Sequence, residues 1–272
     1  MQATTDVIGV IPARLVSTRL PRKALADIAG RPMIQRVYEG ARGCRRLREL
    51  WVATDTEEIA AACRGAGIPV MLTDGAHTSG TSRIAEVLRA HPASAVVNIQ
   101  GDEPMVRGEM LDALLDALFA APEIEIATLA TPLDPGHAAD PAAVKVVCDA
   151  HGRALYFSRA AIPFPRGAAP AYRKHLGYYA YSARALAAFI VWPPGRLESA
   201  EQLEQLRFLE NGWSIAVAET AHDTIGVDTA EDLARVRAHF QAVQPPIQGS
   251  PARRDGAGAE KPRGNGNEAG PA

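Results

Sequence analysis

Four cationic side chains gather between residues 14 and 23, directly after a short apolar run from Val7 to Ile11. That segment contains no acidic residue. Several donors close together suit an oxyanion, above all a triphosphate, because each charged oxygen needs its own donors. A solvated basic loop is the alternative, but the loop follows an expected strand, and open α/β sheets bind ligands at strand ends. The cations are Arg14, Arg19, Arg22 and Lys23.

Two aspartates stand where they could hold a metal ion. Asp102 follows a second buried run, residues 95–100, and a turn at Gly101, whereas Asp228 precedes the last expected helix. Mg²⁺ prefers one or two carboxylates together with phosphate oxygens. The pair therefore predicts a Mg²⁺ site beside the phosphates. The alternatives are an exposed turn for Asp102 and helix capping for Asp228.

Two further segments have the composition of a binding pocket. Small hydroxyl residues and a glycine precede an expected helix in residues 78–83, where Arg83 could reach an anion and Thr81 could equally cap the helix. His175 and Tyr179 alternate on an expected strand and should share one face. A lone histidine is more often structural, so this second segment indicates a pocket only together with its neighbours.

Alternating strands and helices must position these residues in the first half of the chain. Such alternation predicts a mostly parallel sheet with helices on both faces, which is an α/β fold. The expected strands cover residues 7–11, 50–54, 69–72 and 95–100, and the expected helices lie near 32–42, 56–66, 81–90 and 108–120.

The second half predicts a smaller antiparallel or mixed-sheet sub-region, such as a lid or a dimerisation element, because its strands lack long helices between them. The strands are expected at 124–131, 144–149, 154–158 and 175–182, followed by a helix near 198–210, a strand at 213–218 and a helix at 229–241. Residues 1–244 should form a single domain. Residues 245–272 are rich in glycine and proline, which predicts a disordered tail.

Composition excludes several classes of protein. The formal net charge of −2 argues against a nucleic-acid partner, and the longest apolar runs fall short of the roughly 20 residues that span a bilayer. The three cysteines form no CxxC pair, which favours reduced thiols and a cytoplasmic location. Phosphate-binding GxxxxGK[ST], dinucleotide-binding GxGxxG and nucleophile-elbow GxSxG motifs are missing.

The chain resembles the 3-deoxy-manno-octulosonate (Kdo) cytidylyltransferase family. The matching stretches run in the family's order from residue 7 to about 240 and include IPARLVSTRLPRKAL, VNIQGDEPM, HLGYYAY and GVDTAEDL. The first is shared with enzymes that activate sialic acid, whereas QGDEP, ALYFSR and HLGYYAY are more specific to Kdo. The resemblance implies a GT-A-like nucleotidyltransferase, usually a homodimer, that uses Mg²⁺ and converts CTP and Kdo to CMP-Kdo and pyrophosphate for lipopolysaccharide synthesis.

The resemblance also implies roles for individual residues. The nucleotide and its phosphates would be bound by Arg14, Ser17, Arg19, Lys23, Ser79, Gly80 and Arg83. Asp102 and Asp228 would hold the metal and, with Lys23 and Arg14, act in catalysis. The sugar pocket would contain Arg83, Gln100, His175, Tyr179, Glu204 and Gln205. For Glu204 and Gln205, a solvated helix face is the alternative.

Three other functions stay open. The enzyme could activate another acidic sugar, such as a sialic acid or 8-amino-Kdo, because the nucleotide half would be the same. It could be a non-catalytic nucleotide-binding homologue, although both metal carboxylates are present. A glycosyltransferase that consumes a nucleotide sugar would usually carry a DxD motif at a strand end, and none occurs here.

Overall fold

The computed structural model describes residues 6–243 except 16, 18, 78 and 169. Within these residues, one sheet has the strand order β11-β7-β10-β6-β1-β4-β5, and β8 joins β10 to β9. The sheet contains β1 (Val7–Ala13), β4 (Glu49–Thr54), β5 (Val70–Leu72), β6 (Ala95–Asn98), β7 (Ile126–Leu133), β8 (Lys145–Cys148), β9 (Ala154–Ser158), β10 (Tyr172–Ser182) and β11 (Ala216–Glu219), and a separate hairpin contains β2 (Asp27–Ile28) and β3 (Arg31–Pro32).

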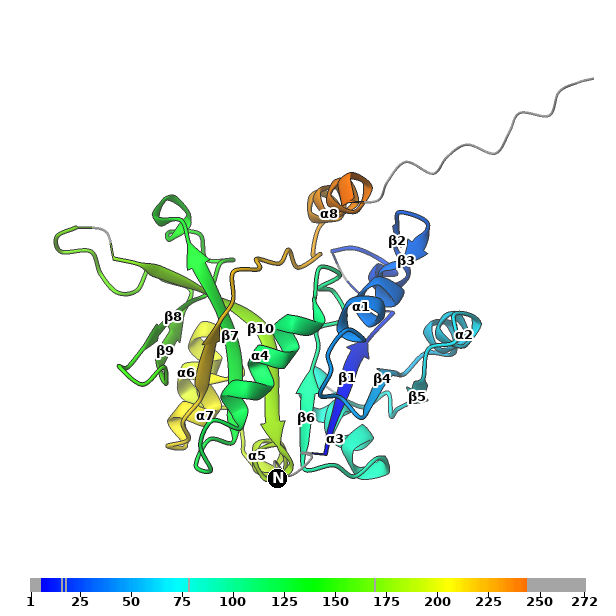
Figure 1. The fold of residues 1–272 in the computed structure, drawn as a ribbon, viewed down its shortest axis with the longest axis horizontal. Coiled ribbons are helices and arrows are strands. Elements are labelled where there is room, and N and C mark those ends of the chain that lie inside the picture. Colours follow the sequence, from blue (N-terminus) through cyan, green and yellow to red (C-terminus); the bar gives the residue numbers. More distant parts are fainter. Residues whose placement is uncertain (1–5, 16, 18, 78, 169, 244–272) are drawn as a thin grey trace, which may run out of the picture.

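Helices cover both faces of the sheet (Figure 1). They are α1 (Met33–Ala41), α2 (Glu57–Gly65), α3 (Gly80–Ala90), α4 (Gly108–Leu118), α5 (Ala183–Val191), α6 (Arg196–Glu201), α7 (Leu206–Glu210) and α8 (Ala230–Val243). No helix in the described part of the chain is long and apolar enough to cross a membrane.

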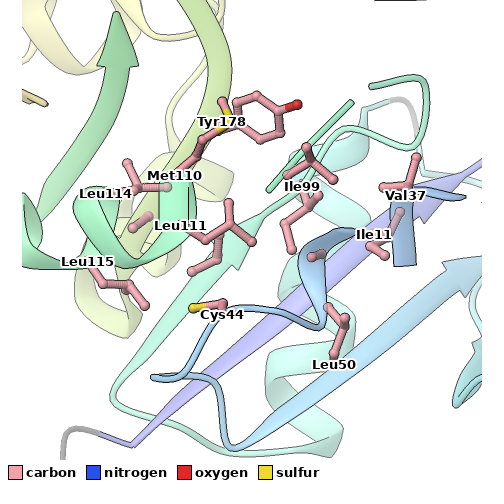
Figure 2. Close-up of a cluster of buried hydrophobic side chains, with 14 of the residues drawn as sticks. Ile11, Val37, Cys44, Leu50, Ile99, Met110, Leu111, Leu114, Leu115 and Tyr178 are labelled. Atoms are coloured by element: carbon pink, nitrogen blue, oxygen red, sulfur yellow. The ribbon is translucent and has the colours of Figure 1, made fainter. Parts of the chain in front are cut away.

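The central strands are apolar on both faces because each face is covered. On β1, Val7 and Ile11 pack into one buried cluster, with α1, α2 and α4, whereas Ile8 and Val10 pack into a second, with α3, α5 and α7. Figure 2 shows part of the first cluster, with side chains of α4 on one side, Ile11 and Val37 on the other, and Ile99 between them. This alternation is typical of a strand buried in a three-layer α/β fold.

Strand β10 brings the second half of the chain next to the first. It runs antiparallel to both β6 and β7, whereas β1 is parallel to β4 and β6, and β4 is parallel to β5. The pairing of β10 with β7 shifts register between Leu176 and Tyr179, so that two residues of β10 bulge there. The α/β fold with an antiparallel sub-region is therefore confirmed, and it places this bulge close to the end of β6.

Several predicted elements need correction. The helix expected at 198–210 is two short helices, because Gln202 adopts a left-handed conformation, φ 54°, between α6 and α7. Helix α5 was not predicted, and the strand expected at 213–218 begins at Ala216. The tail expected at 245–272 lies outside the described residues.

Candidate active site

A cavity of about 380 Å³ opens at the carboxyl ends of β1 and β6. Strand ends are where open α/β sheets bind ligands, because the loops that follow the strands converge there. The cavity brings together most of the residues predicted to bind the nucleotide and the metal. Its lining includes Arg14, Ser17, Arg19, Lys23, Gly80, Gln100, Gly101, Asp102 and Asp228.

Two positively charged side chains and two carboxylates meet in this cavity. Lys23 Nζ donates to Asp102 Oδ2 at 2.7 Å and to Asp228 Oδ1 at 3.0 Å, and Arg19 contacts Asp228 Oδ2 at 3.0 Å. Burial lowers the pKa of Lys23, but Asp102 and Asp228 outweigh it, and the net pKa is raised. Lys23 is therefore an ammonium ion at neutral pH.

Backbone contacts hold the two carboxylates together although 126 residues separate them in sequence. The Val227 N–H donates to the Asp102 carbonyl at 2.9 Å, which fixes the segment before Asp228 against the loop that follows β6. Thr229 caps α8, since its Oγ1 accepts from the Asp232 N–H and the Asp232 carboxylate accepts from the Thr229 N–H. Helix capping therefore does not occupy the Asp228 side chain, which remains available to the cavity.

The cavity wall approaches the backbone closely at Gly101. A Cβ atom there would lie 2.6 Å from the Pro12 carbonyl oxygen, far inside normal contact distance. Glycine is therefore required where β1 and β6 end side by side. At Gly80 a Cβ atom would lie 3.2 Å from Pro12 Cγ, so a second glycine keeps the start of α3 against the same wall.

One of the four predicted cations does not face the cavity. Arg22 adopts a left-handed conformation, φ 58°, and forms an ion pair with Glu58. Arg14 lines the cavity, and its guanidinium also donates to the His77 carbonyl at 3.0 Å. The grouping of Arg22 with the phosphate loop is thus wrong, and Arg14, Arg19 and Lys23 are the cations of the site.

The donor set at the cavity fits a divalent cation. One ammonium contacts both carboxylates, so Asp102 Oδ2 and Asp228 Oδ1 converge on a single point that favours positive charge. Both are hard oxygen ligands of the kind that Mg²⁺ prefers. Across the described residues, no group of three or more His, Cys, Asp or Glu side chains could hold a metal. A metal here would therefore need further oxygens from water or a bound phosphate.

Arg83 does not reach the cavity, in contrast to the prediction that it binds the nucleotide and the sugar. Its side chain is fully buried, donates to Asp55 Oδ2 at 2.9 Å and hydrogen-bonds Thr73 Oγ1. These partners follow β4 and β5, so Arg83 ties α3 to the ends of two strands. Ser79, predicted on the nucleotide side, caps α3 by accepting from the Ser82 N–H at 3.2 Å.

Three predicted sugar-pocket residues lie together near the bulge of β10. Gln100 lines the cavity and donates through Nε2 to the Gly177 carbonyl at 3.1 Å. His175 and Tyr179 share one face, with ring centroids 5.5 Å apart, and His175 Nε2 hydrogen-bonds Thr128 Oγ1 at 3.0 Å. Burial lowers the pKa of His175 to about 3, so its ring is neutral at pH 7.

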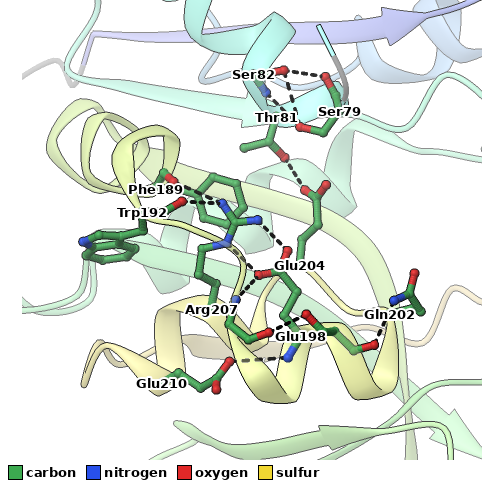
Figure 3. Close-up of polar contacts among 12 residues, drawn as sticks. Ser79, Thr81, Ser82, Phe189, Trp192, Glu198, Gln202, Glu204, Arg207 and Glu210 are labelled. Atoms are coloured by element: carbon green, nitrogen blue, oxygen red, sulfur yellow. Dashed lines mark hydrogen bonds and ion pairs between the residues drawn. The ribbon is translucent and has the colours of Figure 1, made fainter.

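Glu204 and Gln205 lie in the turn between α6 and α7 and not on a continuous solvated helix face. Glu204 is exposed, and its Oε2 accepts from Thr81 Oγ1 at 2.8 Å (Figure 3). Gln205 is buried, and its Nε2 has no hydrogen-bond partner among the described residues. The two residues therefore offer a carboxylate and an amide donor from the same turn.

Sequence reasoning missed several residues around the site. Burial, reinforced by Asp102, raises the pKa of Glu103 to about 7, and the Tyr178 hydroxyl lies 3.4 Å from its carboxylate. Arg207 and Glu198 form an ion pair that holds α6 against α7. The position of Glu103 next to Asp102 was a signal that could have been used, whereas the Glu198–Arg207 contact depends on the unpredicted break at residue 202.

Known proteins resemble this chain over most of its length. The family model described as "Cytidylyltransferase" matches residues 8–219. Proteins named 3-deoxy-manno-octulosonate cytidylyltransferase from Acidobacterium capsulatum and Koribacter versatilis are 52% identical over 236 residues (86% of this chain, 96% of the relative) and 51% identical over 235 residues (86% and 89%).

Solved structures agree with these matches. A structure titled CMP:2-keto-3-deoxy-manno-octonic acid synthetase complexed with CTP has a TM-score of 0.85 and 42% identity, and the match covers 88% of this chain and 99% of that one. A putative glucose-1-phosphate thymidylyltransferase from Bacillus anthracis has a TM-score of 0.63 at 16% identity, with coverage of 88% and 96%. The second likeness shows the fold alone.

Proposed function

The chain belongs to the 3-deoxy-manno-octulosonate cytidylyltransferase family, and we propose that it transfers CMP from CTP to Kdo with release of pyrophosphate. The observation that carries this proposal is the cavity in which Arg19 and Lys23 meet Asp102 and Asp228 at the ends of β1 and β6. A triphosphate needs several cations, and a phosphoryl transfer needs its charge held in place.

The nucleotide would bind with its phosphates against the loop after β1. Arg14, Arg19 and Lys23 line the cavity there and would donate to the β- and γ-phosphate oxygens. These donors would stabilise the charge that develops on pyrophosphate as it leaves. Ser17 and Gly80 line the same cavity and would add close contacts to the nucleotide.

Asp102 and Asp228 would hold the Mg²⁺ ion expected for this family, and the ion would supply Lewis-acid stabilisation of charge on the phosphate oxygens. The two carboxylates fit that role because their oxygens converge on one point. The Val227–Asp102 backbone hydrogen bond and the α8 cap would keep that convergence fixed.

The sugar would lie between the carboxyl end of β6 and the bulge of β10. Gln100 and Gln205 would donate amide hydrogens to the sugar carboxylate, and Glu204 would accept from a sugar hydroxyl. His175, which is neutral, would complete the pocket together with Tyr179. The anomeric hydroxyl would lose its proton to water and attack the α-phosphorus in line, so that a new O–P bond forms as the α–β anhydride bond breaks and pyrophosphate leaves. Positioning and electrostatics would therefore supply most of the catalysis.

Pyrophosphate release from each nucleoside triphosphate, with and without Kdo, tests this proposal. We expect release with CTP and Kdo together and none with either omitted. Release with a sialic acid or with 8-amino-Kdo in place of Kdo would favour a different acidic sugar, and no release with any of the three would favour a non-catalytic homologue. Arg19→Ala should raise the KM for CTP, whereas Arg22→Ala, which changes a residue outside the cavity, is the matched control.

We also propose a homodimer in the cytoplasm that serves lipopolysaccharide synthesis, and a single domain over residues 1–244. The large apolar side chains of Leu155 on β9 and Phe164 in the following loop, 62% and 82% exposed, give a second copy a surface to cover. Light scattering of the purified protein would measure the mass. A mass of one chain at micromolar concentration would contradict the dimer.

A further inference from the structure

We propose that Thr81 is a positioning residue for sugar binding, because its hydroxyl fixes the carboxylate of Glu204. The inference rests on the proposed function, in which Glu204 accepts a hydrogen bond from a sugar hydroxyl. Thr81 Oγ1 donates to Glu204 Oε2 at 2.8 Å, across 123 residues of sequence. Figure 3 shows this bond joining the first turn of α3 to the turn between α6 and α7.

The Thr81 hydroxyl does not cap the helix, because another residue does so, and it contacts the Tyr181 hydroxyl as well as Glu204. Ser79 Oγ accepts from the Ser82 N–H at 3.2 Å, so that Ser79 and not Thr81 is the N-cap of α3. The sequence left Thr81 open as a cap, and the structure excludes that role. Thr81 is 3% exposed, so its hydroxyl is oriented by the surrounding protein and is shielded from competing water.

Glu204 needs such an anchor because it is an exposed residue with a long side chain. A carboxylate has two oxygens, and the Thr81 bond uses Oε2, which leaves Oε1 to accept from a ligand. A long flexible side chain that is held in one rotamer binds a ligand more tightly, since less conformational entropy is lost on binding. The anchor therefore acts on sugar affinity through Glu204.

Contacts of the neighbouring helices hold the backbone at Glu204, so the side chain is the part that Thr81 orders. Arg207 donates to Glu198 through Nε at 2.7 Å and through Nη2 at 2.5 Å, which ties α6 to α7 on either side of the turn. Leu206 follows the turn and is fully buried. A lost Thr81 bond should therefore loosen the Glu204 carboxylate without moving the turn.

The anchor also joins the two halves of the site. Gly80, the residue before Thr81, lines the cavity where the phosphates would bind, whereas Glu204 lies on the sugar side. Because Thr81 itself does not line that cavity, loss of its hydroxyl should leave the nucleotide side unchanged. The expected signature is a change in the KM for the sugar without a change in the KM for CTP.

Two variants of Thr81 separate positioning from packing. Thr81→Val removes the hydroxyl and keeps the side-chain volume, whereas Thr81→Ser keeps the hydroxyl and removes a methyl group. We expect Thr81→Val to raise the KM for the sugar about tenfold, with the KM for CTP within twofold of wild type. Thr81→Ser should stay close to wild type in both. The opposite order, with Ser impaired and Val normal, would assign Thr81 a packing role and overturn the proposal.

A double-mutant cycle with Glu204→Ala tests whether Thr81 acts through Glu204. In the Glu204→Ala background, Thr81→Val should have no further effect on the KM for the sugar, because its partner is already gone. Additive effects of the two substitutions would overturn the proposal. If Thr81→Val did not fold, Thr81→Ala and Thr81→Cys would provide the hydroxyl-free side chain for the same comparison.

A crystallographic measurement keeps the inference separate from the identity of the sugar. Wild-type activity with CTP and Kdo tests the proposed function, and its absence would refute that function alone. The Glu204 carboxylate should have one well-ordered position in crystals of the wild-type and Thr81→Ser proteins, and it should be disordered or displaced in Thr81→Val. Equal order in all three would overturn the role of Thr81 whatever the sugar is.

Discussion

Replacement of Glu198 by alanine should destabilise the protein strongly, because it breaks an ion pair that is nearly buried. The side chains of Glu198 and Arg207 are 11% and 12% exposed, and two hydrogen bonds of 2.7 and 2.5 Å join them. The Glu198 carboxylate also accepts from the Gly195 N–H at 2.9 Å. Arg207 donates further to the carbonyls of Phe189 and Trp192, so that one guanidinium connects α5, α6 and α7 (Figure 3).

The size of the effect follows from the burial of the partner that remains. Glu198→Ala leaves the Arg207 guanidinium in the protein interior without its hydrogen-bonded carboxylate. Removal of one member of a buried pair typically costs about 3–5 kcal/mol. For a domain of this size that loss lowers the melting temperature by roughly 6–20 °C. Glu123→Ala is the matched control, since it breaks a pair with Arg153 whose side chains are 55% and 37% exposed. An exposed pair contributes about 0–1 kcal/mol.

Urea unfolding of wild type, Glu198→Ala and Glu123→Ala gives the comparison. The Trp192 carbonyl accepts from Arg207, and the Trp192 ring packs against Trp213 with ring centroids 5.6 Å apart, so the fluorescence of these two residues should follow the transition. Similar losses of unfolding free energy in the two variants would refute the argument from burial. Glu198→Ala should also raise the KM for the sugar acid more than the KM for CTP, because the pair holds the turn that carries Glu204. An equal change in both KM values would contradict that part.

Three further predictions concern the site itself. Asp102→Asn should lower turnover by about a thousandfold or more with an unchanged melting temperature, since it removes one of two carboxylates that converge on the cation position; near-normal kcat in excess Mg²⁺ would argue against it. Lys23→Ala should raise the KM for CTP more than the KM for Kdo in steady-state kinetics, and the reverse order would count against the phosphate loop. His175 has a pKa of about 3 in the folded protein and about 6.5 when unfolded, so the unfolded state binds the extra proton and stability falls as pH drops below 6.5. Between pH 7 and pH 5, the free energy of unfolding should fall by about 2 kcal/mol less in His175→Gln than in wild type, as measured by urea unfolding at both pH values.

The parallel half of the sheet was predictable because each strand is a short run that is apolar on both faces. A strand that helices cover on both faces, such as β1, is a continuous apolar run whichever helices pack on it, and a turn or a helix bounds each run in the sequence. The positions of Asp102 and Asp228 followed, since both come directly after or before such elements. Their closeness was predictable only in part, because it depends on the Val227–Asp102 hydrogen bond, which no local pattern encodes.

The errors concern side-chain direction and one helix break. Arg83 and Arg22 sit where they were expected along the chain, but their partners come from elsewhere. Arg83 donates to the Asp55 carboxylate in the protein interior, and Arg22 pairs with Glu58 outside the cavity. No glycine or proline at residue 202 predicts the end of the helix there, and the helical spacing of apolar residues continues past Gln202. Helix α5 had a usable signal, because Ser182 caps it by accepting from the Ala185 N–H ahead of an apolar run.

The alignment of the two proposed substrates depends on backbone pairing more than on any single side chain. Strand β10 runs antiparallel to β6 with Tyr179 opposite Asn98, so the sugar-side residues are fixed to the strand whose following loop carries Asp102. Gln100 then spans the two sides, since it lines the cavity and donates to the Gly177 carbonyl in the bulge. Main-chain hydrogen bonds of a central strand pair are among the least mobile contacts in a domain. The distance between nucleotide and sugar is therefore set by the sheet, whereas side chains such as Glu204 adjust how tightly each substrate binds.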